Sequence, residues 1–189
     1  MKRLMLSGML SLICVILMAP SLPFEWREST SVNLYERYMR DVADMKRKEA
    51  FDAFKHRLGF RESGNNPHAV NPLGYIGEWQ FGAAALKDVG RSVSIRAFHR
   101  DPSIWTREQQ EEDLETLINL NAIRLQWYIN HFDGKIVRGV LVTKSGILAA
   151  AHLAGAKGVM NWFNTGYNPK DYFGTKLTDY MIQFIGYEF

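Results

Sequence analysis

Apolar residues recur at intervals of three and four along the first half of the chain. The members of this run are Leu34, Tyr38, Met39, Val42, Met45, Ala50, Phe51, Phe54 and Leu58, with polar residues between them. Such spacing predicts two amphipathic helices or one long bent helix. The hydroxyl groups of residues 29–31 are suited to cap the N-terminus of this region. The helix is expected to end near Ser63, because four poor helix formers follow at residues 64–67.

The second half of the chain carries further helical patterns. They cover residues 79–88, 106–131, 144–154, 156–164 and 175–186. In the longest, Thr106 is a capping residue and an apolar stripe follows at Leu114, Leu117, Ile118, Asn121, Leu125 and Tyr128. The residues Asn71-Pro72-Leu73-Gly74 match the preferences of a type I turn. The prediction is therefore a mainly α domain over residues 31–189, with a small hairpin or irregular lobe near residues 68–78.

The N-terminal segment differs from the rest of the chain. Lys2 and Arg3 precede an apolar run at residues 4–19, and small residues allow cleavage after Ser21. These features predict a signal peptide over residues 1–21, with an uncleaved membrane anchor as the alternative. Residues 22–30 are predicted to form a linker. The expected location is outside the cytoplasm, in the periplasm or cell envelope, and membrane association is expected only through this segment.

Charge and residue spacing exclude several classes of function. The formal net charge is +3, and removal of Lys2 and Arg3 would leave +3 − 2 = +1. A nearly neutral chain whose basic residues alternate with acidic ones is not expected to bind nucleic acid. The five histidines have no close pair at metal-ligand spacing, so no metal site is expected. No cofactor-binding motif is present, and protein partners and oligomeric state are not predicted.

Two blocks of sequence carry a family resemblance. The first contains Glu62-Ser63, Asn66-Pro67, Ala69-Val70, Gly74, Gly77 and Gln80, and the second is residues 146–159 with its Ala-Gly and Gly-Val pairs. This chain resembles the soluble type of lytic transglycosylase, in the lysozyme-like superfamily. In the second block His152 and Leu153 replace the tyrosine and asparagine that the family usually has. The resemblance covers most of residues 50–165 and implies a lysozyme-like helical fold.

The resemblance implies cleavage of peptidoglycan glycan strands with Glu62 as the single acid/base. The protonated carboxyl would donate to the leaving oxygen, which requires surroundings that disfavour the charged form. The negative end of a helix dipole has this effect. Nearby aromatic side chains are expected to add to it: Phe60, Tyr75, Trp79 and Phe81. The sugar's own 6-hydroxyl would then close the ring, which gives a 1,6-anhydro-muramyl end.

Four further residues are predicted to bind substrate. By the resemblance, Gln80 hydrogen-bonds the sugar, and Ser63 either assists the acetamido group, orients Glu62 or is simply a polar residue at a helix end. Trp79 offers a ring on which a sugar can stack, although an aromatic residue at this spacing is also typical of a core. His152 is either a buried core histidine or the replacement for the family's tyrosine beside Glu62.

Two alternatives remain open. A hydrolytic muramidase needs a second carboxylate to activate water. That base would be Glu78 or a distant aspartate, although a solvated, non-catalytic side chain is the preferred interpretation of Glu78. A non-catalytic peptidoglycan-binding or scaffolding protein could have kept the fold after the change at residues 152 and 153 removed support for catalysis. The sequence does not predict glycan length, cross-link preference or physiological process.

Overall fold

The computed structural model describes residues 24–189, and the predicted signal peptide or anchor lies outside the described residues. The chain divides into two units with the boundary between Glu49 and Ala50, and each unit is described by itself. Within residues 24–189, no helix combines the length and apolar character that crossing a membrane requires.

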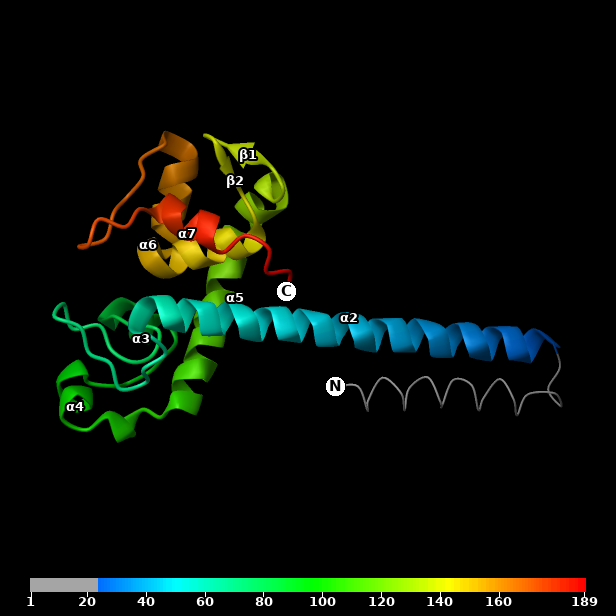
Figure 1. Ribbon diagram of the computed structural model, residues 1–189, viewed down its shortest axis with the longest axis horizontal. Coiled ribbons are helices and arrows are strands. Elements are labelled where there is room, and N and C mark those ends of the chain that lie inside the picture. Colours follow the sequence, from blue (N-terminus) through cyan, green and yellow to red (C-terminus); the bar gives the residue numbers. More distant parts are fainter. Residues whose placement is uncertain (1–23) are drawn as a thin grey trace. The chain divides into compact units, whose positions relative to one another are not determined.

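The first long helix, α2, spans Phe24–Ser63 (Figure 1). It is one continuous helix, and its end at Ser63 is confirmed. Residues 24–30, which lie in the predicted linker, form the first turns of α2 rather than an irregular segment. No glycine or proline occurs from Phe24 to Leu58, so nothing in the backbone stops the helix at the hydroxyl residues 29–31.

The second unit, residues 50–189, contains the end of α2 and all remaining elements. In chain order these are α3 (Ala83–Asp88), α4 (Ile95–Arg100), the 3₁₀ helix η1 (Pro102–Ile104), α5 (Arg107–Phe132), β1 (Ile136–Val137), β2 (Val140–Leu141), α6 (Lys144–Thr165) and α7 (Leu177–Gln183). The two strands are antiparallel, with Ile136 opposite Leu141 and Val137 opposite Val140. The fold is mainly helical, as the sequence predicts.

Two local predictions for the helices are confirmed. Thr106 caps α5, where its hydroxyl accepts from the Gln109 N–H and the Gln109 side chain accepts from the Thr106 N–H. The predicted division near residue 155 is also present, because Gly155 has φ 68° and ψ 163° and interrupts the helical backbone of α6. Only glycine adopts these angles readily. The Ala-Gly pair of the second sequence block therefore marks a break in the helix.

The lobe at residues 68–78 is irregular and contains isolated bridges between Val70 and Ile76 and between Ile76 and Phe81. These bridges explain why α3 begins at Ala83 rather than at residue 79. Phe81 pairs with Ile76 through backbone hydrogen bonds, and Gln80 has a left-handed φ of 50°, so neither residue has a helical conformation. The sequence did not predict α4, η1 or the β1–β2 hairpin. These elements are short, and their apolar residues are too few to show a period.

The core joins the end of α2 to α7 and the C-terminal tail. Phe54 is completely buried, and its ring lies 5.2 Å from that of Phe184 and 5.0 Å from that of Phe189. The buried Ser145 hydroxyl of α6 donates to the Phe184 carbonyl at 2.6 Å, which fixes the end of α7 against α6. This packing places a segment from the end of the chain beside the last turn of α2.

Candidate functional site

The last turn of α2 ends in a tight reversal. Gly64 (φ 68°) and Asn65 (φ 60°) both have left-handed backbone conformations. Their N–H groups return to the helix, from Gly64 to the Phe60 carbonyl at 3.0 Å and from Asn65 to the Gly59 carbonyl at 3.1 Å. Glu62 is therefore held in the final turn, at the negative end of the helix dipole.

The Glu62 side chain is half-buried and pairs with a residue that the sequence analysis missed. The hydroxyl of Tyr180, on α7, donates to Glu62 Oε1 at 2.5 Å. Tyr180 is 3% exposed, and its ring stacks against that of Phe184 at a centroid distance of 6.0 Å. Burial and the adjacent Glu62 carboxyl raise the pKa of Tyr180 well above its usual range, so its hydroxyl remains a hydrogen-bond donor.

Arg61 completes this cluster from the other side of the tyrosine ring. Its guanidinium lies 4.2 Å from the ring centroid of Tyr180 and donates to Oε1 of Gln183. Tyr180 is thus held between a cation and an aromatic ring. No local sequence signal identified Tyr180, because 118 positions separate it from Glu62 and a tyrosine on a helix with apolar neighbours is typical of a core.

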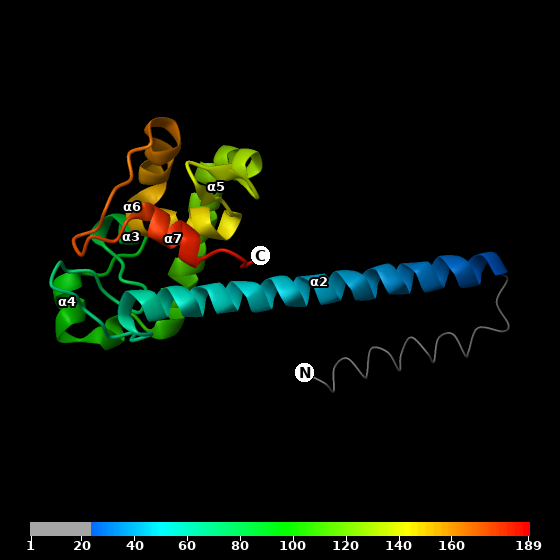
Figure 2. The same ribbon diagram turned by 45° about the horizontal axis from the view of Figure 1, so that its top comes forward.

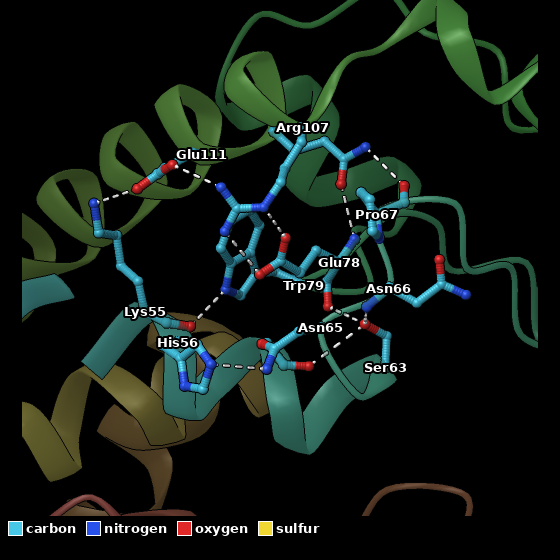
Figure 3. A network of polar contacts seen from close by, with 12 residues as sticks. Lys55, His56, Ser63, Asn65, Asn66, Pro67, Glu78, Trp79, Arg107 and Glu111 are labelled. Atoms are coloured by element: carbon cyan, nitrogen blue, oxygen red, sulfur yellow. Dashed lines mark hydrogen bonds and ion pairs between the residues drawn. The ribbon is translucent and has the colours of Figure 1, made fainter. Parts of the chain in front are cut away.

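Ser63 connects the end of α2 to the following loop. Its hydroxyl donates to the Glu78 carbonyl at 2.7 Å and accepts from the Asn66 N–H at 2.9 Å (Figure 3). The side chain is therefore engaged by the backbone in this structure, and it fixes the loop that contains residues 78–80 next to Glu62. A role toward the acetamido group of a substrate stays a prediction.

Glu78 is a buried structural carboxylate. The preferred interpretation from the sequence, that its side chain is solvated, is therefore wrong. Its exposure is 0%, and its Oε2 lies 2.8 Å from Nε of Arg107 (Figure 3). Its backbone N–H donates to the side chain of Gln110 at 2.8 Å. A carboxylate in this position cannot meet a water molecule beside a sugar without breaking the ion pair, so the structure gives no support to Glu78 as the base of a muramidase.

Trp79 belongs to the core, which corrects its prediction as a sugar-stacking residue. It is 1% exposed, and its indole N–H donates to the Lys55 carbonyl at 2.8 Å. Neither face of the ring is open to a ligand in this arrangement. The predicted aromatic surroundings of Glu62 divide in the same way: Phe81 is buried in the core, whereas Phe60 and Tyr75 are 57% and 42% exposed.

Gln80 lies beside the core with 9% of its surface exposed. Its side-chain amide donates to the Gly77 carbonyl at 2.9 Å, so part of the side chain folds back onto its own turn. The left-handed backbone at this residue, φ 50°, is rare for a side chain other than glycine. Unusual backbone geometry of this kind is common at functional sites. Hydrogen bonding of Gln80 to a substrate stays a prediction.

His152 does not replace the expected tyrosine as a partner of Glu62. Its Nε2 lies 2.8 Å from the Trp79 carbonyl, and because a carbonyl only accepts, Nε2 carries the proton. The other ring nitrogen, Nδ1, is buried and has no hydrogen-bond partner among the described residues. His152 therefore fixes the 77–81 loop against α6, while Tyr180 provides the hydroxyl beside Glu62.

An open depression is lined by residues that adjoin Glu62 and Tyr180 in the sequence, and neither Glu62 nor Tyr180 is among the residues that line it. It has a volume of about 380 Å³ and is lined by Arg61, Phe173, Gly174, Thr175, Asp179, Ile182 and Gln183. Arg61 precedes Glu62 in α2, and Asp179 precedes Tyr180 in α7. Its walls combine one aromatic ring with hydroxyl, amide, carboxylate and guanidinium groups, which suits a polar organic ligand.

The described residues contain no group of three or more His, Cys, Asp and Glu side chains placed to hold a metal ion. No family model, curated protein or solved structure matches this chain.

Proposed function

We propose that this protein is an exported peptidoglycan lytic transglycosylase that cleaves the bond between N-acetylmuramic acid and N-acetylglucosamine. The observation that carries the proposal is the half-buried Glu62 at a helix end, hydrogen-bonded to Tyr180 at 2.5 Å. A single carboxyl held in one orientation has the properties of an acid/base catalyst. The sequence blocks around Glu62 and Gly155 supply the family resemblance on which the choice of substrate depends.

In this mechanism Glu62 acts twice. The protonated carboxyl first donates its proton to the glycosidic oxygen as the bond to the muramic acid anomeric carbon breaks. The resulting carboxylate then takes the proton of the 6-hydroxyl of the same sugar, whose oxygen forms the new bond to that carbon. Glu62 ends protonated, no water is consumed, and the product has a 1,6-anhydro end. Tyr180 holds the carboxyl through its hydrogen bond but does not lose its own proton.

The burial of Glu78 favours this route over hydrolysis. A muramidase requires a second carboxylate placed to activate water or attack the sugar, and Glu78 is fully buried and paired with Arg107. The intramolecular attack of the 6-hydroxyl needs no such group. The location proposed for this activity is the periplasm or cell envelope, by virtue of the predicted signal or anchor at residues 1–21.

Product analysis tests the proposal. Purified protein is incubated with intact peptidoglycan sacculi, and the released fragments are identified by mass spectrometry. Anhydro-muramyl ends are expected, and Glu62→Gln should lower the rate by about a hundredfold or more. Glu188→Gln is the matched control, because Glu188 is an exposed carboxylate near the C-terminus with no role in the proposed mechanism.

Three results contradict the proposal. Full activity in Glu62→Gln would exclude this residue as the acid. Reducing ends that contain oxygen from labelled water would identify a hydrolase. Binding to sacculi without any released fragment would identify a non-catalytic wall-binding protein.

A further inference from the structure

Two short hairpins in the second unit are built in the same way although they are far apart in the sequence. In the first, residues 70–76, the Asn71 N–H donates to the Tyr75 carbonyl at 3.0 Å and the Gly74 N–H donates to the Asn71 carbonyl at 3.0 Å. The Asn71 side chain also accepts from the Tyr75 N–H at 3.0 Å. This side-chain bond fixes the turn.

The second hairpin, residues 170–176, repeats every one of these bonds. The Asp171 N–H donates to the Thr175 carbonyl at 2.9 Å, and the Gly174 N–H donates to the Asp171 carbonyl at 3.1 Å. The Asp171 side chain accepts from the Thr175 N–H at 2.7 Å. The base of the hairpin is fixed to α7, because the Asn168 amide donates to the Thr178 hydroxyl at 2.8 Å.

The tip of the second hairpin exposes two aromatic rings. Tyr172 and Phe173 are 77% and 71% exposed, and their ring centroids lie 5.3 Å apart at an interplanar angle of 90°. The tip of the first hairpin exposes Leu73 at 49%. Two neighbouring aromatic side chains that a fixed turn keeps exposed to water contribute little to the stability of the fold. Exposed apolar groups of this kind commonly mark binding surfaces.

Both hairpins lie close in sequence to the candidate site. The first is followed directly by residues 77–80, and the second ends four residues before Tyr180. In Figures 1 and 2 the loop around residues 68–78 (blue-green) and the loop around residues 166–176 (orange) extend to the same side of the second unit. A polymer bound at Glu62 would therefore meet the hairpin tips on its way across the site.

The depression beside the second hairpin has the chemistry of a sugar-binding site. Phe173 offers a flat apolar face, while Thr175 and Asp179 offer oxygen atoms and Arg61 offers N–H donors along the same walls. A pyranose ring presents C–H groups on its faces and hydroxyl groups around its edge, so it matches an aromatic face bordered by polar groups. A purely apolar partner would cover these polar groups without supplying hydrogen bonds of its own.

We infer that the Tyr172–Phe173 tip binds a sugar ring of the glycan strand at a distance from the bond that Glu62 cleaves. The inference rests on the proposed function and adds to it a preference for polymeric substrate. Strands long enough to reach the tip bind more tightly than a short oligosaccharide that occupies only the reacting position.

The test measures binding and cleavage separately in the full chain. Binding is measured in the Glu62→Gln background by calorimetry, with peptide-free glycan strands and with a tetrasaccharide prepared from the same peptidoglycan. Tyr172→Ala and Phe173→Ala, singly and together, should weaken binding of the long strands by about tenfold in the double variant and leave the tetrasaccharide affinity unchanged. Phe173→Tyr keeps a ring and should retain affinity.

Tyr35→Ala is the matched control, because Tyr35 is a 56% exposed aromatic residue of the first unit. Unchanged binding of long strands by the double variant overturns the inference, and so does a parent protein that binds no strands. Cleavage by the wild-type protein is scored independently. If the wild-type protein binds strands through the tip but releases no fragment, the tip is a glycan-binding site and the transglycosylase proposal fails. If it cleaves normally while tip substitutions leave strand binding intact, only the inference fails.

Discussion

Tyr180 donates its hydroxyl to Glu62 Oε1 at 2.5 Å, and with the hydrogen bond from Arg61 to Gln183 it joins the last turn of α2 to the short helix α7. The two residues come from distant parts of the chain. The bond depends on the aromatic packing of Phe54 against Phe184, which brings the two helices together. The candidate site is therefore assembled by the core rather than by a local motif.

Replacement of Tyr180 tests the role of this hydrogen bond. Tyr180→Phe keeps the ring that contacts Arg61 and Phe184 but removes the hydroxyl that orients Glu62. We expect kcat on soluble glycan strands to fall by about tenfold to a hundredfold, with a much smaller change in KM. Steady-state kinetics with soluble glycan strands separate the two constants. An unchanged kcat would show that Glu62 does not depend on Tyr180.

The same residue predicts a dependence of stability on alkaline pH. Because the pKa of Tyr180 is raised in the folded state, the hydroxyl stays protonated there while the tyrosine of the unfolded chain ionises above about pH 10. Its contribution to stability is complete below that pH and is lost as the pH rises further.

Urea unfolding at pH 8 and pH 11 measures this contribution. Lys55 also titrates in the alkaline range: burial opposes its charge, but hydrogen bonds to Glu111, Glu115 and Asp52 outweigh burial and raise its pKa. The comparison of wild-type protein with Tyr180→Phe isolates the tyrosine. The wild-type protein should lose more stability between the two pH values. Equal losses would contradict the assigned environment of Tyr180.

The ion pair between Arg107 and Glu78 is expected to affect stability but not catalysis. Arg107→Ala would leave the fully buried Glu78 carboxylate without its cationic partner. We expect the free energy of unfolding to fall by about 2 kcal/mol, which is less than for a fully buried pair because Arg107 itself is half-exposed. Chemical denaturation measures this loss. Glu78→Gln should also be less stable, but the folded fraction should cleave sacculi at the wild-type rate. A loss of catalysis in the folded Glu78→Gln variant would instead support a muramidase.

Gly59 tests the close approach between α2 and the 77–80 loop. A Cβ atom at this position would lie 2.7 Å from Oδ1 of Asn65 and 2.9 Å from Oε1 of Glu78. Gly59→Ala is therefore expected to destabilise the protein by about 1–3 kcal/mol and to lower activity, because the loop must shift away from Glu62. Thermal unfolding and the sacculus assay measure the two effects.

Gly64→Ala is the comparison for Gly59. Its Cβ would meet no atom within 4 Å, so the cost is limited to the left-handed backbone, at about 1 kcal/mol. If both substitutions lowered stability and activity equally, the packing at Gly59 would not be the determining factor.

The sequence by itself determined the local features of this protein. The mainly helical class, the end of α2 at Ser63, the Thr106 cap and the break at Gly155 all follow from backbone preferences and spacing within one or two turns. These interactions join residues close in the chain, so the sequence contains them directly. The irregular lobe near residues 68–78 was predictable for the same reason, from a cluster of turn-forming residues.

Only the tertiary structure decided which side chains surround Glu62. Burial depends on neighbours from distant segments. The sequence therefore could not show whether Trp79 lies in the core or on the surface, or whether Glu78 forms an ion pair or is exposed to water. His152 is fixed by the Trp79 carbonyl, because α6 lies against the loop that contains Trp79. Tyr180 takes the position beside the glutamate, because α7 meets the end of α2. Long-range packing, which no local pattern encodes, assembles the candidate site.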